Sequence, residues 1–181
     1  MRNALLTRVH MSPVGVLPPR STATETRIQL ADPAVTAMND FTREYPVTVD
    51  EERQINAAWA DMIRLGVRAL LVVRELKVVG FITSYDIEGE RPIQYMQGSN
   101  ITRRQDLQVG HIMTPWRDLV TLSWRAVKDA RVVDLLQAFR DTNLMHLLVV
   151  ETASDGSTCV RGLFSRTRIE RQLGVLPAMT A

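Results

Sequence analysis

The sequence predicts an α/β fold of the α+β type, in which two β-α-β-β-α repeats pack as a pseudo-twofold tandem module behind an irregular N-terminal arm. Three observations lead to this prediction. One order of strand-like and helix-like apolar segments occurs twice, 181 residues suffice for two small repeats, and 45% hydrophobic with 23% charged residues is typical of a folded chain. Each repeat alone would have a marginal core, and packing two together removes that weakness.

The first 31 residues show no sustained helical or strand period and contain Pro13, Pro18 and Pro19. We interpret residues 1–31 as a mobile or partner-dependent arm. Four arginines against one glutamate give this arm a net charge of +3, so the rest of the +2 chain is close to neutral at −1. Such a balance does not favour a nucleic-acid partner, and we expect none.

The first repeat is assigned to residues 32–92. A short predicted strand at 46–49 is followed by acidic residues 50–52, which favour the start of a helix. That helix has one apolar face and is predicted to end at Gly66. Two strands, 69–73 and 78–82, follow it, and Thr83 opens a second helix. The apolar residues that recur at three- and four-residue spacing are Ile55, Ala58, Trp59 and Met62.

The second repeat, residues 109–174, is predicted to follow the same course. Its elements are a strand at 119–122, a helix at 127–141, strands at 147–150 and 160–164, and a helix from Ser165. Matching positions lie 73 residues apart at the first strand, 77 at the central strand and 82 at the paired glycines. The offset between matching positions increases at turns, where insertions are tolerated. Residues 93–108 are predicted to connect the repeats, with a short helix near 92–96, and residues 175–181 to form a C-terminal tail.

Two strings mark the repeats: Gly80-Phe81-Ile82-Thr83-Ser84-Tyr85-Asp86 and Ile112-Met113-Thr114-Pro115. Their order and spacing resemble the CBS domain, named after cystathionine β-synthase, which normally occurs as a tandem pair called a Bateman module. A weaker counterpart of the second string is Ala37-Met38-Asn39-Asp40, and the resemblance covers about residues 33–174. It implies a stand-alone regulatory or sensor module that forms a homodimer, binds an adenine nucleotide or related adenosyl ligand, and acts on an unidentified partner protein in trans.

Thr83 and Asp86 are the central candidates for ligand binding. A helix that begins at Thr83 would present unpaired N–H groups to phosphate oxygens. Asp86, one turn later, could accept hydrogen bonds from the vicinal hydroxyls of a ribose, which is the role that the resemblance implies. The same Thr-x-x-Asp pattern also forms a capping box, in which both side chains bind the backbone at the helix start. The two roles are compatible.

The resemblance further implies a cation beside the phosphate, just before the central strand of either repeat. Arg68 and His146 occupy these positions. A His146 that binds only when protonated would lose anion affinity as the pH rises through about 6.5. An apolar slot for adenine would be formed by Val47, Ile82 and Tyr45. The alternative is that these residues belong to the surface or the core.

The second repeat departs from the pattern. It keeps Gly162 and a hydroxyl at Ser165, but Arg168 stands where the carboxylate belongs. Since a guanidinium has only donors, it cannot accept hydrogen bonds from ribose hydroxyls. We therefore expect two unequal clefts, of which the second is degenerate and either empty or occupied by a simple anion.

No catalytic motif is evident, because the sequence lacks HExxH, P-loop, GxSxG and GxGxxG patterns. We predict no enzyme, no metal and no required cofactor, with AMP, ADP, ATP, NAD-type molecules and S-adenosylmethionine as possible ligands. The alternative function is a dimerisation scaffold with non-functional ligand sites, for which Met113, Trp116 and Trp124 are candidate contacts. The single Cys159 and the absence of an apolar run of ~20 residues predict a cytoplasmic protein without a membrane segment.

Overall fold

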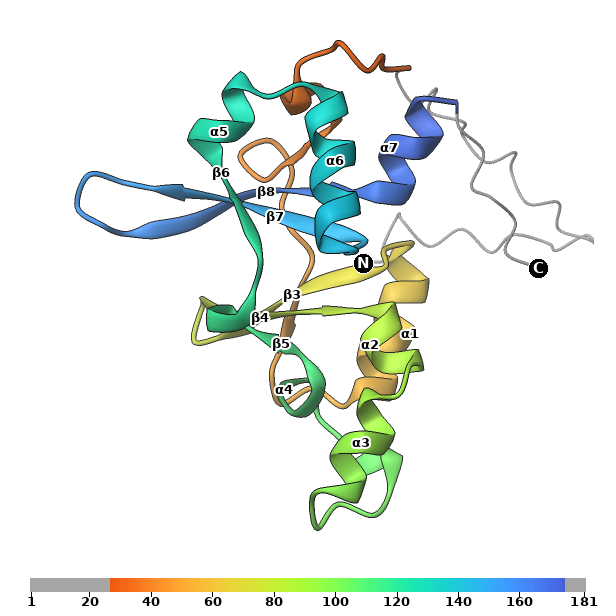
Figure 1. Ribbon diagram of the computed structural model, residues 1–181. Helices are drawn as coiled ribbons and strands as arrows, with labels where there is room; N and C mark the ends of the chain where they lie inside the picture. The colour runs from red at the N-terminus through yellow and green to blue at the C-terminus, as the bar shows by residue number, and fades with distance from the viewer. Residues whose placement is uncertain (1–26, 175–181) are drawn as a thin grey trace, which may run out of the picture.

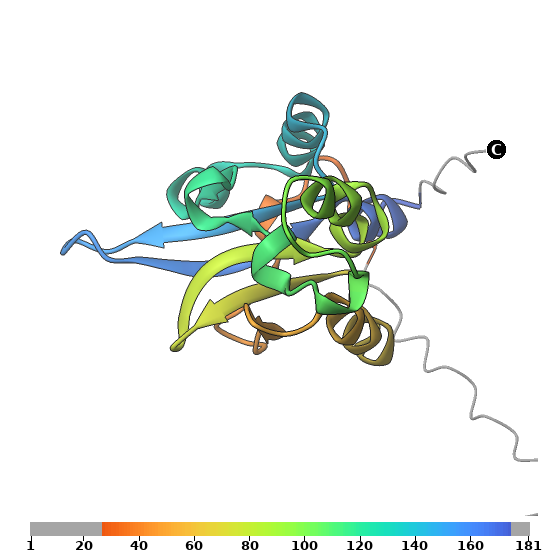
Figure 2. The same cartoon turned by 90° about the horizontal axis from the view of Figure 1, so that it is seen from below.

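The computed structural model describes residues 27–174, which form two four-stranded sheets that face each other, with helices on the outer sides (Figures 1 and 2). Both repeats have the predicted β-α-β-β-α order, so the predicted α+β tandem fold is confirmed. Most of the predicted arm, residues 1–31, lies outside the described residues, as does the whole predicted tail, residues 175–181.

Each sheet combines one parallel and two antiparallel strand pairs. The first sheet has the order β2 (Thr48–Asp50), β3 (Ala69–Arg74), β4 (Lys77–Thr83), β5 (Thr114–Pro115). The second has the order β1 (Asn39–Asp40), β8 (Thr158–Ser165), β7 (His146–Thr152), β6 (Thr121–Ser123). The register shifts at the same point in both sheets: Val79 of β4 is the extra residue opposite Val72 and Val73, and Arg161 of β8 is the extra residue opposite Val149 and Val150.

The helices of the first half are α1 (Ile55–Leu65), α2 (Ser84–Glu88), α3 (Arg91–Gln97) and α4 (Val109–Ile112). Those of the second half are α5 (Trp124–Asp129), α6 (Val132–Thr142) and α7 (Arg166–Gln172). Short 3₁₀ turns cover Ala34–Ala37, Arg104–Asp106 and Trp116–Asp118. As predicted, α1 ends at Gly66, which has a left-handed φ of 69°. The helix predicted near 92–96 is α3.

The single helix predicted at 127–141 is wrong, because the chain is extended at Ala130 and divides into α5 and α6. Residues of the N-terminal segment form hydrogen bonds with the backbone groups at this break. Ala34 N donates to Ala130 O at 2.9 Å, and Val132 N donates to Asp32 O at 2.9 Å. The apolar residues at helical spacing, 132–139, all lie in α6 after the break, so their pattern could not reveal where that helix begins.

The two repeats exchange their edge strands. β1 precedes the first repeat's β2 in the chain yet pairs with β8, and β5 precedes the second repeat's β6 yet pairs with β4. Each exchanged strand packs closely against a glycine of the strand that it pairs with. A Cβ atom on Gly80 would lie 2.8 Å from Thr114 O, and one on Gly162 would lie 2.6 Å from Asn39 O. Only glycine fits at these crossings.

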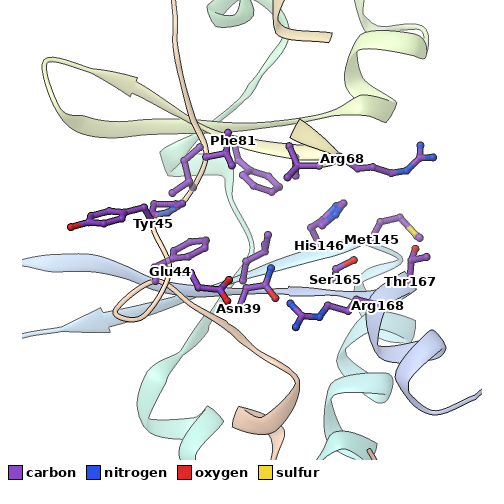
Figure 3. A pocket seen from close by; sticks show the side chains of 18 of the residues that line it. Asn39, Glu44, Tyr45, Arg68, Phe81, Met145, His146, Ser165, Thr167 and Arg168 are labelled. Atoms are coloured by element: carbon purple, nitrogen blue, oxygen red, sulfur yellow. The ribbon is translucent and has the colours of Figure 1, made fainter. Parts of the chain in front are cut away.

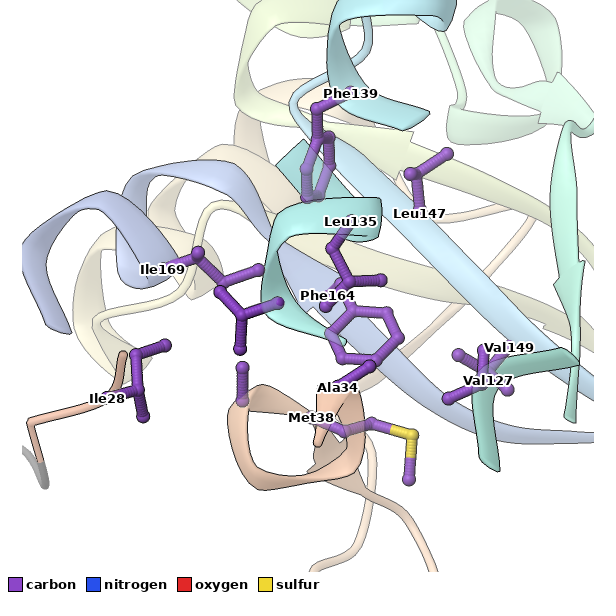
Figure 4. Close-up of a cluster of buried hydrophobic side chains, with 12 residues drawn as sticks. Ile28, Ala34, Met38, Val127, Leu135, Phe139, Leu147, Val149, Phe164 and Ile169 are labelled. Atoms are coloured by element: carbon purple, nitrogen blue, oxygen red, sulfur yellow. The ribbon is translucent and has the colours of Figure 1, made fainter. Parts of the chain in front are cut away.

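Each repeat has its own core, and a third small cluster joins the sheets. Residues before β1 complete the core of the second repeat, where Ile28 is 6% exposed (Figure 4). The compact part therefore begins before Asp32, where the sequence predicted its start. Between the sheets, Leu71 and Phe81 of one repeat meet Leu148 of the other. Through this contact the two sheets pack face to face (Figure 2).

Candidate functional site

Two cavities of similar size lie where the repeats meet. The Asp86 cavity, of about 470 Å³, is formed by the β4–α2 junction and by the residues that lead into β6 and β7. The Arg168 cavity, of about 440 Å³, is formed by the β8–α7 junction and by the residues that lead into β2 and β3 (Figure 3). Equivalent positions line both: Phe81 and Leu163, Thr83 and Ser165, Tyr85 and Thr167, Asp86 and Arg168.

Thr83 and Asp86 form the capping box at the start of α2. Asp86 Oδ2 accepts hydrogen bonds from Thr83 N at 2.7 Å and from Thr83 Oγ1 at 2.8 Å. In return, Asp86 N donates to Thr83 Oγ1 at 3.3 Å. The capping role that the sequence allowed is thus real. It holds the Asp86 carboxylate in one orientation at the wall of the cavity.

The backbone N–H groups at the start of α2 are largely satisfied inside the protein. Thr83 N donates to Asp86, and Ser84 N donates to Arg68 O at 2.9 Å. Asp86 N donates to the Thr83 hydroxyl. The sequence-based expectation of several N–H groups open to a phosphate is therefore wrong, because the capping box and the neighbouring strand bind them. A phosphate in this cavity would need another donor.

Arg91, at the start of α3, is a site residue that the sequence did not reveal. Its Nη1 lies 3.1 Å from Asp86 Oδ1. The same nitrogen donates to Ile112 O at 2.9 Å and to Thr114 Oγ1 at 3.0 Å. The only signal in the sequence was the short helix near 92–96, which places Arg91 at a helix start but says nothing about partners more than twenty residues away.

The predicted adenine and phosphate contacts do not share one cavity. Arg68, Val47 and Tyr45 line the Arg168 cavity, not the Asp86 cavity. The backbone of Arg68 lies beside the end of β4, since Thr83 pairs with Ala69 and Ser84 N donates to Arg68 O, but the Arg68 side chain lines the other cavity. Tyr45 is fully exposed, so it lies at the rim of the Arg168 cavity and not in its interior. Ile82 is completely buried and lines neither cavity, since strand alternation turns it away from the side of Phe81 and Thr83.

His146 lines both cavities, and its ring packs edge-on against Phe81 with 6.0 Å between the ring centroids. Its buried Nδ1 has no hydrogen-bond partner. Burial lowers the pKa of His146 to about 4, and although nearby Asp86 opposes this shift, Arg68 adds to it. His146 is therefore neutral near pH 7. The expectation that it binds anions until the pH passes about 6.5 is wrong for this environment.

The Arg168 cavity is lined by Ser165 and Arg168, as the resemblance implied for the degenerate site. Arg68 and Arg171 also line it, with Glu44 as the opposing charge (Figure 3). Arg68 and Arg168 line this cavity from the two different repeats, and in Figure 3 the Arg168 side chain extends toward Asn39 while the Arg68 side chain extends the opposite way. This cavity is thus rich in hydrogen-bond donors and has no carboxylate at the position of Asp86.

Within residues 27–174, no group of three or more His, Cys, Asp or Glu side chains could hold a metal ion. No helix in the same range is long and apolar enough to cross a membrane. Cys159 is exposed on β8.

The fold and its paired cavities define a tandem-repeat module with candidate ligand sites at the interface between repeats. Residues 38–90 match the family model of the CBS domain. The first repeat is therefore a CBS domain, and the described chain has the fold of a CBS-domain pair. A comparison with curated protein sequences finds no match.

Solved structures of CBS-pair proteins share this fold. CBSX2 in complex with AMP has a TM-score of 0.55 and 20% identity, over 78% of this chain and 94% of that chain. CBSX2 is a CBS-pair protein from Arabidopsis thaliana. The CBS domain pair of protein MJ0100, in complex with 5′-methylthioadenosine and S-adenosyl-L-methionine, has a TM-score of 0.53 and 21% identity, over 80% and 97% of the two chains. An uncharacterized conserved protein from Pyrococcus horikoshii has a TM-score of 0.56 and 20% identity, over 85% and 100%.

Proposed function

We propose that this protein is a regulatory module that binds an adenine nucleotide or a related adenosyl ligand in the Asp86 cavity. The observation that carries the proposal is the fixed Asp86 carboxylate at the wall of a cavity of about 470 Å³. Ligand pockets commonly measure roughly 300–1,000 Å³. Two proteins of the same fold support the ligand class, since CBSX2 is solved with AMP and MJ0100 with two adenosyl compounds.

The chemistry of Asp86 allows capping and ligand binding together. A carboxylate offers about four lone-pair sites, and Thr83 occupies two of them on Oδ2. Oδ1, which is paired with Arg91 at 3.1 Å, is the oxygen that would accept hydrogen bonds from ribose hydroxyls once Arg91 moves. Apolar side chains on the opposite wall, among them Leu119, Val120 and Met145, provide a surface for a purine ring.

The Arg168 cavity would bind a different kind of ligand. Arg68 and Arg168 supply donors for an anion but no acceptor for ribose hydroxyls. We propose that this cavity takes a simple anion or the phosphate part of a ligand, or stays empty. The two cavities then differ in function although the fold repeats them.

We further propose that the protein forms a homodimer and regulates a partner protein in trans, without catalysis of its own. A dimerisation scaffold with non-functional ligand sites is the second candidate. One observation favours it: Arg91 already occupies Asp86 Oδ1, and the N–H groups of Thr83, Ser84 and Asp86 donate within the protein. In that case the cavities would be remnants of a site.

Thermal unfolding with AMP, ATP, NAD and S-adenosylmethionine separates these two functions. A ligand that binds only the folded state at a hundred times its Kd adds ~2.7 kcal/mol to the free energy of unfolding. We expect an increase in Tm with at least one of them and its loss in Asp86→Asn. Arg103→Gln is the matched control and should keep the shift, because Arg103 pairs with Asp106 and lines neither cavity. No shift with any compound would favour the scaffold.

A further inference from the structure

Arg91 is the one permanently charged cation among the described residues that line the Asp86 cavity. The other side chains there are apolar, neutral or acidic, and Asp118 adds a second carboxylate. Arg68, the cation expected at this site from the sequence, lines the other cavity. Any phosphate in the Asp86 cavity therefore depends on Arg91 for its countercharge.

The other possible phosphate donors in this cavity are engaged or uncharged. The N–H groups of Thr83, Ser84 and Asp86 donate within the protein. His146 is neutral near pH 7, because burial lowers its pKa to about 4. This leaves the Arg91 guanidinium, which has five donors in a fork that fits phosphate oxygens.

Arg91 is the more exposed partner of its ion pair with Asp86, although the same Nη1 also donates to Ile112 O and Thr114 Oγ1. The Arg91 side chain is 45% exposed, whereas the Asp86 side chain is 14% exposed and held by two hydrogen bonds from Thr83. A group that approaches Asp86 Oδ1 would move Arg91 rather than Asp86. The released guanidinium would stay close, since it sits at the start of α3, beside the same cavity.

We propose that Arg91 makes the Asp86 cavity selective for phosphorylated adenosyl ligands. The ribose of such a ligand replaces Arg91 at Asp86 Oδ1, and the guanidinium moves to the phosphate. This inference rests on the proposed function of the cavity. An uncharged nucleoside would break the ion pair without offering Arg91 a new anionic partner. The positively charged sulfonium of S-adenosylmethionine would be repelled by the Arg91 guanidinium. The Asp86–Arg91 pair thus disfavours ligands without a phosphate.

Calorimetric titration of AMP and adenosine into the full chain tests this selectivity. In Arg91→Gln, we expect the affinity for AMP to fall about tenfold or more, because a charge-assisted hydrogen bond is lost. The affinity for adenosine should stay equal or rise, because no ion pair has to be broken. Arg91→Lys keeps the charge but not the fork and should lie between the two. Arg103→Gln is the matched control, since Arg103 pairs with Asp106 and lines neither cavity.

The ratio of the two affinities separates selectivity from a folding defect, which would weaken both ligands together. If wild-type protein binds AMP and Arg91→Gln leaves the ratio of AMP to adenosine affinity unchanged, the role of Arg91 is overturned while the proposed function stands. If wild-type protein binds neither AMP nor adenosine, the proposed function is overturned, and the role of Arg91 with it.

Discussion

The Asp86 cavity and the Arg168 cavity occupy equivalent places in the two repeats, yet they are electrostatic opposites. The first contains Asp86 and Asp118 against a single Arg91, whereas the second contains three arginines against Glu44. Asp86, whose carboxylate caps its helix, is replaced at the equivalent position of the second repeat by Arg168.

The backbone, by contrast, is repeated closely. Gly80 and Gly162 both pack closely against an exchanged strand, and β4 and β8 have a bulge at the same point, at Val79 and Arg161. The helices before those strands end at left-handed residues, Gly66 with φ 69° and Asn143 with φ 53°. A shared backbone with different cavities means that fold and ligand preference can be tested separately.

The largest expected effect concerns His146, whose equivalent in the first repeat is Ala69. Its pKa is lowered to about 4 in the folded state, below the ordinary 6.5. The unfolded chain therefore takes up a proton first as the pH falls, and the stability present above pH 6.5 is lost between pH 6.5 and 4. We expect the free energy of unfolding to drop by about 2–3 kcal/mol from this group between pH 7 and 4.5.

Urea unfolding of wild-type protein and His146→Gln at pH 7 and pH 4.5 checks this expectation. On acidification, the free energy of unfolding of the variant should drop by about 2–3 kcal/mol less than that of wild type. Carboxylates that do not interact with position 146 contribute equally to both proteins and cancel in the comparison, whereas Asp86 interacts with His146. Identical pH dependence in the two proteins would show that His146 is not held neutral by its environment.

The next effect concerns the crossing glycines, where the repeats should respond alike. Gly80→Ala and Gly162→Ala each place a Cβ within 2.8 Å of a backbone carbonyl of the exchanged strand. We expect each to reduce the free energy of unfolding by about 1–3 kcal/mol. Gly98→Ala is the control, because its new Cβ would meet nothing closer than 3.8 Å. Clearly different losses at positions 80 and 162 would contradict the equivalence of the two crossings.

The smallest effect separates the two cavities without any ligand. Asp86→Ala removes the capping box and should reduce the free energy of unfolding by about 1 kcal/mol. Arg168→Ala, at the equivalent position, has no capping role and should change it by less than about 0.5 kcal/mol. Denaturant unfolding of the unliganded proteins measures both values. Equal losses would mean that Asp86 has no special structural role at its helix start.

Much of the fold was predictable because it depends on local signals. Strand alternation, the apolar face of α1, and Gly66 at its end follow from neighbouring residues. The pairing of Thr83 with Asp86 was also predictable, since a capping box spans only four residues. The break at Ala130 was not, because its hydrogen bonds go to Asp32 and Ala34, about a hundred residues earlier in the chain.

The sequence by itself determined the two repeats, the capping box at Thr83 and Asp86, and the arginine that replaces the carboxylate at position 168. Only the tertiary structure decided that β1 and β5 change places, that Arg68 belongs to the Arg168 cavity, and that Arg91 belongs to the Asp86 cavity. It also decided the neutral state of His146, through burial. The reason is distance along the chain: periodicity and capping act within a few residues, whereas cavities and burial arise only when two repeats pack.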